Sequence, residues 1–171
     1  SAAGTPLTLT IDANAPTTPT APTLLAADDS GTQGDNLTNV NQPRLTGTVE
    51  AGVTVRLLNG AGTIVGTATA NGSGGYTVSP TAALGDGASS LRVQVVDAAG
   101  NVSATSPSLN LTIDRVAPAA PTSLTLLAAD DSGLAGDGLT YVRQPRLTGN
   151  AESNATVQLL NGAGVVVGTA T

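Results

Sequence analysis

The sequence contains no cysteine, histidine, methionine, tryptophan, phenylalanine or lysine, and its only aromatic residues are Tyr76 and Tyr141. Without cysteine the chain has no disulfide framework and no thiolate nucleophile, and without histidine it has no imidazole base. The same absences exclude zinc and haem ligand sets and a Schiff-base lysine. Paired aspartates remain as possible acid and base groups. They recur unchanged along the chain, which is not expected of an active site, so we predict that the protein is not an enzyme.

Positive charge is also scarce. Twelve carboxylates face only six cationic side chains, all arginine, and the formal net charge is −6. Binding to nucleic acid or to an anionic membrane surface requires clustered Lys and Arg, so neither is an expected partner. No apolar run approaches the length of a membrane span, and we expect no membrane insertion within these residues.

An internal repeat dominates the sequence. Residues 24–69 realign without a gap on residues 126–171, with 33 of 46 positions identical, which gives a period of 102 residues. Such self-similarity is typical of a tandem array. We therefore predict that residues 1–16 are the last strand and joint of one repeat. Residues 17–118 are predicted to form a complete repeat, and residues 119–171 the N-terminal half of the next.

Within the complete repeat, apolar and polar residues alternate over short runs, which is the period of half-buried strands. Clear runs occur at residues 53–57, 91–95 and 109–113. Turn sequences separate them, among them Asn59-Gly60 and Asn71-Gly72. About seven such strands in a hundred residues predict an all-β fold of tandem immunoglobulin-like β-sandwich repeats. The proline-containing segments between repeats favour an extended polyproline II path, so the joints are predicted to be short and semi-rigid.

The acidic residues are clustered, and the clusters recur. Residues 28–36 read DDSGTQGDN, residues 130–138 read DDSGLAGDG, and Asp12 and Asp114 end the last strand of their repeats. In an immunoglobulin-like topology the loop after the first strand and the end of the last strand lie at the same pole. Carboxylates held close together there repel one another unless a cation joins them, and calcium accepts six to eight oxygen ligands.

The same residue types also build ordinary turns, in which their side chains bond to nearby backbone. Two interpretations, a calcium site and an ordinary turn, therefore remain for the acidic loops and for the DAAGN run at residues 97–101. The candidate calcium ligands are Asp12, Asp28, Asp29, Asp35, Asp97, Asn101, Asp114, Asp130, Asp131 and Asp137.

Several of these motifs together resemble a known family. The acidic run from Asp28, PRLTG at residues 43–47, DAAGN at residues 97–101 and TID at residues 112–114 are similar to bacterial Ig-like repeats. Such repeats build the stalks of giant secreted adhesins and biofilm surface proteins. The resemblance implies an extracellular, cell-surface location and a mechanical role in adhesion. It also implies joints between neighbouring repeats that calcium stiffens through aspartates such as Asp28, Asp29, Asp35 and Asp114.

Three functions are alternatives to a mechanical stalk. Threonine is abundant, so a solvent-facing strand surface that binds glycan or another surface is one alternative to a spacer. Assembly with other copies into a filament is a second. The third is a filament subunit completed by a strand from its neighbour, which the numbering does not favour, because positions 70–102 of the last repeat would still be missing.

Overall fold

The computed structural model describes residue 5 and residues 7–171. It divides into two compact units, a first unit that runs to Arg115 and a second unit from Val116 to Thr171, and each is described by itself. Residues 1–4 and 6 of the predicted segment 1–16 lie outside the described residues. Leu7, Leu9 and Ile11 are exposed and form no strand here, since a strand requires a neighbour for its backbone hydrogen bonds.

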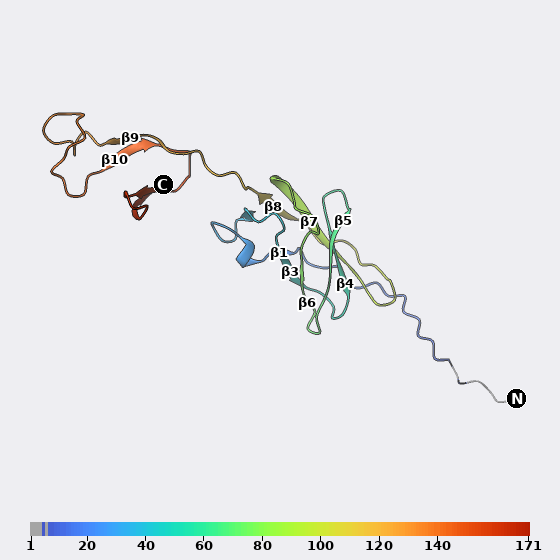
Figure 1. The fold of residues 1–171 in the computed structure, drawn as a ribbon. Helices are drawn as coiled ribbons and strands as arrows, with labels where there is room; N and C mark the ends of the chain where they lie inside the picture. The colour runs from blue at the N-terminus through green and yellow to red at the C-terminus, as the bar shows by residue number, and fades with distance from the viewer. Residues whose placement is uncertain (1–4, 6) are drawn as a thin grey trace. The chain divides into compact units, whose positions relative to one another are not determined.

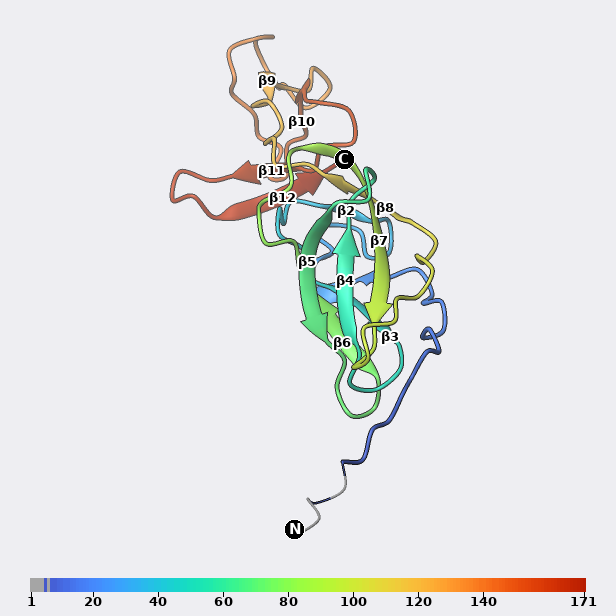
Figure 2. The same ribbon diagram turned by 90° about the vertical axis from the view of Figure 1, so that its right-hand side faces the viewer.

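The first unit is a β-sandwich of a three-stranded and a five-stranded sheet (Figures 1 and 2). The three-stranded sheet has the order β1 (Thr23–Leu24), β3 (Leu45–Thr48), β6 (Gly75–Val78). The five-stranded sheet has the order β2 (Leu37–Thr38), β8 (Leu109–Ile113), β7 (Gly87–Val96), β4 (Thr54–Leu58), β5 (Ile64–Thr69). One 3-10 turn, η1 (Ala26–Asp28), precedes β2, and the described residues contain no α-helix. The predicted all-β class is confirmed.

The core lies between the two sheets and follows from the period of the strands. On β7, Leu91, Val93 and Val95 are buried and alternate with the partly exposed Arg92 and Gln94. The strands β4 and β8 alternate in the same way, which confirms the strands predicted at residues 53–57, 91–95 and 109–113. Burial of each large aliphatic side chain contributes about 1.5–3 kcal/mol to folding, before the opposing chain entropy is counted.

Tyr76 is the one aromatic residue of this core. It lies on β6 opposite Gly47 of β3, and a Cβ atom at position 47 would stand 2.5 Å from the tyrosine hydroxyl oxygen. The ring therefore covers the place where another residue would have its side chain, which accounts for glycine in the middle of β3. Burial raises the pKa of Tyr76 above its ordinary value.

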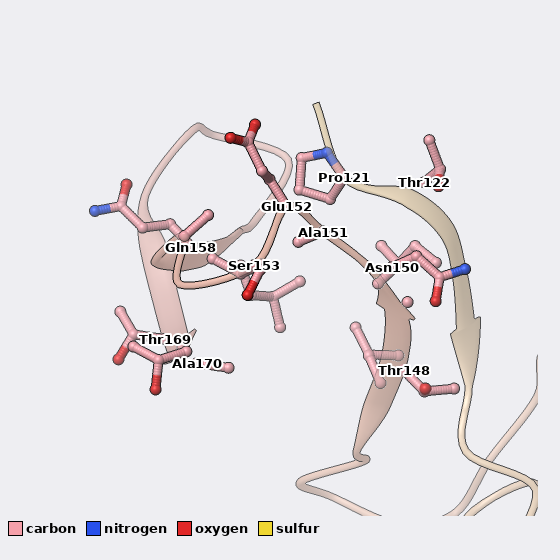
Figure 3. Close-up of a pocket in the computed structure, with 18 of the residues that line it drawn as sticks. Pro121, Thr122, Thr148, Asn150, Ala151, Glu152, Ser153, Gln158, Thr169 and Ala170 are labelled. Atoms are coloured by element: carbon pink, nitrogen blue, oxygen red, sulfur yellow. The ribbon is translucent and has the colours of Figure 1, made fainter. Parts of the chain in front are cut away.

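The second unit contains two separate pairs of antiparallel strands. The strands β9 (Thr122–Leu126) and β10 (Leu147–Asn150) pair as β1 and β3 do, and β11 (Val157–Leu160) and β12 (Val166–Ala170) pair as β4 and β5 do. Leu147 is 40% exposed, Val157 and Leu159 are half-buried, and a cavity of about 650 Å³ lies between the two strand pairs (Figure 3). That this unit begins another repeat stays a prediction.

Candidate functional site

The acidic loop after β1 is fixed to β3 by a bidentate ion pair. Oδ2 of Asp28 accepts hydrogen bonds from the backbone N–H of Arg44 at 2.7 Å and from its Nε at 2.9 Å, and Oδ1 accepts from Nη2 at 2.5 Å. The carboxylate is buried, with Asp28 only 7% exposed, while the guanidinium remains about half exposed. Arg44 therefore supplies the charge that this buried aspartate needs, and its hydrogen bond lowers the pKa of Asp28.

The same ion pair occurs in the second unit. Arg146 donates to Asp130 from its backbone N–H at 2.7 Å, from Nε at 2.9 Å and from Nη2 at 2.7 Å. These hydrogen bonds lower the pKa of Asp130 from 3.8 to about 2. Sequence reasoning assigned Asp28 and Asp130 to calcium and missed their arginine partners. A signal was present, since Arg44 and Arg146 recur together with the two aspartates, each sixteen positions away.

Asp29 stands next in the loop and has one oxygen without a donor. Its Oδ2 accepts from the N–H of Gly34 at 2.6 Å, whereas Oδ1 is buried and has no hydrogen-bond partner among the described residues. Asp131 repeats this arrangement, with Gly136 donating to Oδ2 at 2.6 Å and Oδ1 again buried and unpaired. A buried carboxylate oxygen without a donor is uncommon and costs free energy. The same unpaired oxygen therefore occurs in both acidic loops.

The loop and the end of β8 lie side by side, as the sequence predicted. The N–H of Asp114 donates to the carbonyl of Thr38 at 2.9 Å, and the N–H of Thr112 donates to the carbonyl of Asn36 at 2.9 Å. Asp35 is exposed, and its Oδ1 accepts from the N–H of Leu37, as Oδ1 of Asp137 does from Leu139. We call this end of the sandwich, with Asp28, Asp29, Asp35 and Asp114, the exit end.

The other predicted ligands of the first unit, Asp12, Asp97 and Asn101, lie at the opposite end of the sandwich, which we call the entry end. Asn101 donates from Nδ2 to Oδ2 of Asp97 at 2.9 Å and to the backbone carbonyl of Asp12 at 3.1 Å. Oδ1 of Asp97 accepts from the N–H groups of Ala99 and Asn101, and these bonds, above all those from Asn101, lower the pKa of Asp97. Oδ1 of Asp12 accepts from the N–H of Asn14 at 3.0 Å. Asp97 and Asn101 thus form a turn that also binds residues 12–22, the proline-containing segment that enters the sandwich and that we call the linker.

The two ends are far apart within one unit. Gly87, at the start of β7, pairs with Ile113 at the exit end, and Val96, at its end, pairs with Thr54 at the entry end. A strand of ten residues separates them by about 30 Å. In the first unit the predicted ligands therefore lie in two groups, one at each end of the sandwich. The cavity in the second unit contains none of them among its lining residues.

The sequence pattern of bacterial Ig-like domains matches residues 15–115, which is more than half of the chain. The chain belongs to the bacterial Ig-like domain family. Domains of this family are typical of surface or adhesin proteins and are usually non-catalytic. A search of curated proteins found no match to the chain. The described residues of this Ig-like protein include no helix with the length and hydrophobicity of a membrane span.

Neither end of the Ig-like domain holds a ready-made metal centre in this conformation. Across residue 5 and residues 7–171, no three acidic side chains are grouped closely enough to hold a metal ion. At the exit end both oxygens of Asp28 are bound by Arg44, and at the entry end both oxygens of Asp97 accept hydrogen bonds. Oδ1 of Asp29 is the buried oxygen that these local bonds leave unused.

The arginine–aspartate pairs of the Ig-like domain predict an acid-sensitive stability. A carboxyl group whose pKa is lowered in the folded state stabilises it above the ordinary pKa of 3.8, and this contribution is lost as pH falls through the folded pKa. We expect the urea midpoint to be constant from about pH 7 to pH 5 and to fall between about pH 4 and pH 2. Urea titrations followed by circular dichroism measure it. The acid decrease should be smaller in Arg44→Gln, and equal midpoints at pH 6 and pH 2.5 in the unaltered chain would contradict the prediction.

Proposed function

We propose that this chain is a structural segment of an extracellular bacterial surface fibre or adhesin stalk, built from tandem Ig-like repeats. Its principal partners would be the neighbouring repeats of the same chain. The observation that carries the proposal is the recurrence of the acidic loop with the same contacts. The Asp28–Arg44 pair and the unpaired oxygen of Asp29 both have counterparts in the second unit. A spacer repeats its structural contacts, whereas a ligand-binding site is usually specialised.

The linker of the first unit suits a stalk. Pro16, Pro19 and Pro22 are buried, although the linker has no regular secondary structure. Spaced prolines hold the backbone in an extended path. A linker that is both extended and packed on its sandwich resists the bending that a flexible coil would permit.

We also propose that calcium stiffens the joints. Asp29, Asp35 and Asp114 would hold an ion at the exit end, and Asp12 and Asp97 would supply oxygens at the entry end. The donor set suits calcium, because it offers carboxylate and carbonyl oxygens and one buried oxygen, Oδ1 of Asp29, that has no donor. Calcium would supply positive charge to an acidic region whose arginines are already paired with other carboxylates.

The expected free energy is small. Extracellular modules bind calcium with dissociation constants of about 0.1–1 mM. At roughly 1 mM free calcium each site therefore adds about 0.4–1.4 kcal/mol to stability. The sandwich should fold without the ion, and the effect of the ion should be on the joint.

Small-angle scattering of the full chain tests the calcium proposal. We expect a chelator to decrease the radius of gyration while far-UV circular dichroism stays unchanged. Magnesium is the matched ion control, because it requires near-ideal octahedral geometry and should not restore the larger radius. In the double variant Asp29→Ala, Asp131→Ala the radius should no longer respond to calcium. A radius that is the same with calcium and with chelator would contradict the proposal.

A further inference from the structure

The backbone N–H and C=O groups of the linker that enters the first unit have few hydrogen-bond partners within the linker itself. An extended polyproline path has no internal hydrogen bonds, and Pro16 and Pro19 have no N–H to donate. Thr17 stands between them, and its N–H points to a partner outside the linker. That partner is Glu50, thirty-three positions later in the sequence.

Glu50 accepts twice from the same linker residue. Its Oε1 lies 2.8 Å from the backbone nitrogen of Thr17 and 3.0 Å from the hydroxyl oxygen of that residue. A hydrogen bond to an ionised carboxylate is stronger than one between neutral groups. One carboxylate oxygen therefore fixes both the backbone and the side chain of the linker at this point.

The second unit makes the same contact independently. Oε2 of Glu152 lies 3.1 Å from the backbone nitrogen of Ala119, again thirty-three positions apart. Glu152 follows β10, with Pro121 beside it (Figure 3). Alanine offers no hydroxyl, so the second contact has one donor where the first has two.

The turn that carries Glu50 is held in place by the sandwich. The N–H of Val49 donates to the carbonyl of Gly74 at 2.9 Å, and that of Gly52 donates to the carbonyl of Ala70 at 3.2 Å. Gly52 has φ +78°, and Asn154, with φ +65°, occupies the same place in the second unit. Both residue types adopt this left-handed conformation more readily than others, so the turn is preserved across the substitution.

We infer that Glu50 and Glu152 are positioning residues that hold each linker on the sandwich that follows it, by accepting hydrogen bonds from the linker backbone, and that they do so without a metal ion. Asn101 adds a second attachment upstream, at the carbonyl of Asp12. The inference rests on the proposed stalk function. It adds that each linker is attached to one neighbour, the sandwich that follows it.

Amide hydrogen exchange of the full chain, measured by NMR in the presence of a chelator, tests the inference. In Glu50→Ala we expect the exchange of the Thr17 amide to accelerate by about tenfold. In Glu50→Gln, which keeps the acceptor oxygen but removes the charge, most of the protection should remain. Each joint is the internal control for the other, so Glu152→Ala should accelerate Ala119 and leave Thr17 unchanged.

The number of hydrogen-bond donors in each linker, two at Thr17 and one at Ala119, gives a further check of the inference. Thr17→Ala should lower the protection of residue 17 to the level of Ala119, since it removes the hydroxyl that only the first linker has. Circular dichroism confirms that each variant remains folded.

Three results would overturn the inference. They are unchanged Thr17 exchange in Glu50→Ala, equal losses in Glu50→Gln and Glu50→Ala under chelation, and a decrease in Thr17 protection when calcium is added to the unaltered chain. The last would show that the carboxylate leaves the linker for the ion. The calcium proposal can fail alone. This would be the result if the radius of gyration did not change with calcium while Glu50→Ala still accelerated the exchange of the Thr17 amide.

Discussion

Leu45→Ala is expected to lower the free energy of unfolding of the first unit by about 2–5 kcal/mol. Leu45 lies on β3 in the centre of the sandwich and is 0% exposed. Its removal loses the transfer free energy of the side chain and leaves a cavity between two sheets that cannot fully close. Urea unfolding followed by the fluorescence of Tyr76, in a Tyr141→Phe background so that one tyrosine reports on the first unit, measures the change.

The chain contains a matched control for this substitution. Leu147 occupies the identical position in the second unit, within the same PRLTG sequence, and is 40% exposed. Because the side chain of Leu147 is 40% exposed where that of Leu45 is 0% exposed, Leu147→Ala removes less buried surface and should change the stability of its unit by less than about 1 kcal/mol. Equal effects at the two positions would contradict the different packing of the two units.

Gly74→Ala is expected to destabilise the first unit by about 2–4 kcal/mol. Gly74 has φ +83°, and a Cβ atom there would stand 2.1 Å from the carbonyl oxygen of Val49. The obstacle is backbone, held by the hydrogen bond between the Val49 N–H and the Gly74 carbonyl, so it cannot rotate away. Both strain and collision must be relieved by moving the turn, and the urea midpoint reports the cost.

Gly62→Ala separates the backbone strain from the collision with the Val49 carbonyl. Gly62 has φ +81°, almost the same conformation, but nothing lies within 4 Å of a Cβ atom there. Only the left-handed strain applies, for which we expect about 1–2 kcal/mol. If Gly62→Ala were as harmful as Gly74→Ala, the contact with Val49 would have no part in the effect.

The sequence predicts the long strands of the first unit well, because alternation is a strong signal where one face of a strand is buried. Leu91, Val93 and Val95 alternate with polar residues, and the structure places all three in the core. The two short strands are different. Thr23–Leu24 and Leu37–Thr38 contain two residues each, too few for any period, and they join different sheets. That division depends on contacts with β3 and β8, which local sequence does not encode.

The candidate site is predicted less completely for a similar reason. Proximity of the acidic loop to the end of β8 follows from the topology, and the structure confirms it through Asp114 and Thr38. The partner of Asp28 is sixteen positions away and that of Glu50 thirty-three, and both pairings depend on side-chain direction in the folded sandwich. Counting acidic residues shows where negative charge gathers, but it does not show which oxygens are already bound.

The parallel pairing of β2 with β8 determines how the first unit would bear tension. Leu37 and Thr38 lie beside Thr112 and Ile113, the last residues before the chain leaves the sandwich. If the linker is pulled from the entry end and Asp114 from the exit end, these two strands are drawn in opposite directions along their length. The hydrogen bonds of the pair, among them those donated by Thr112 and Asp114, are then loaded in shear and must break together rather than one after the other.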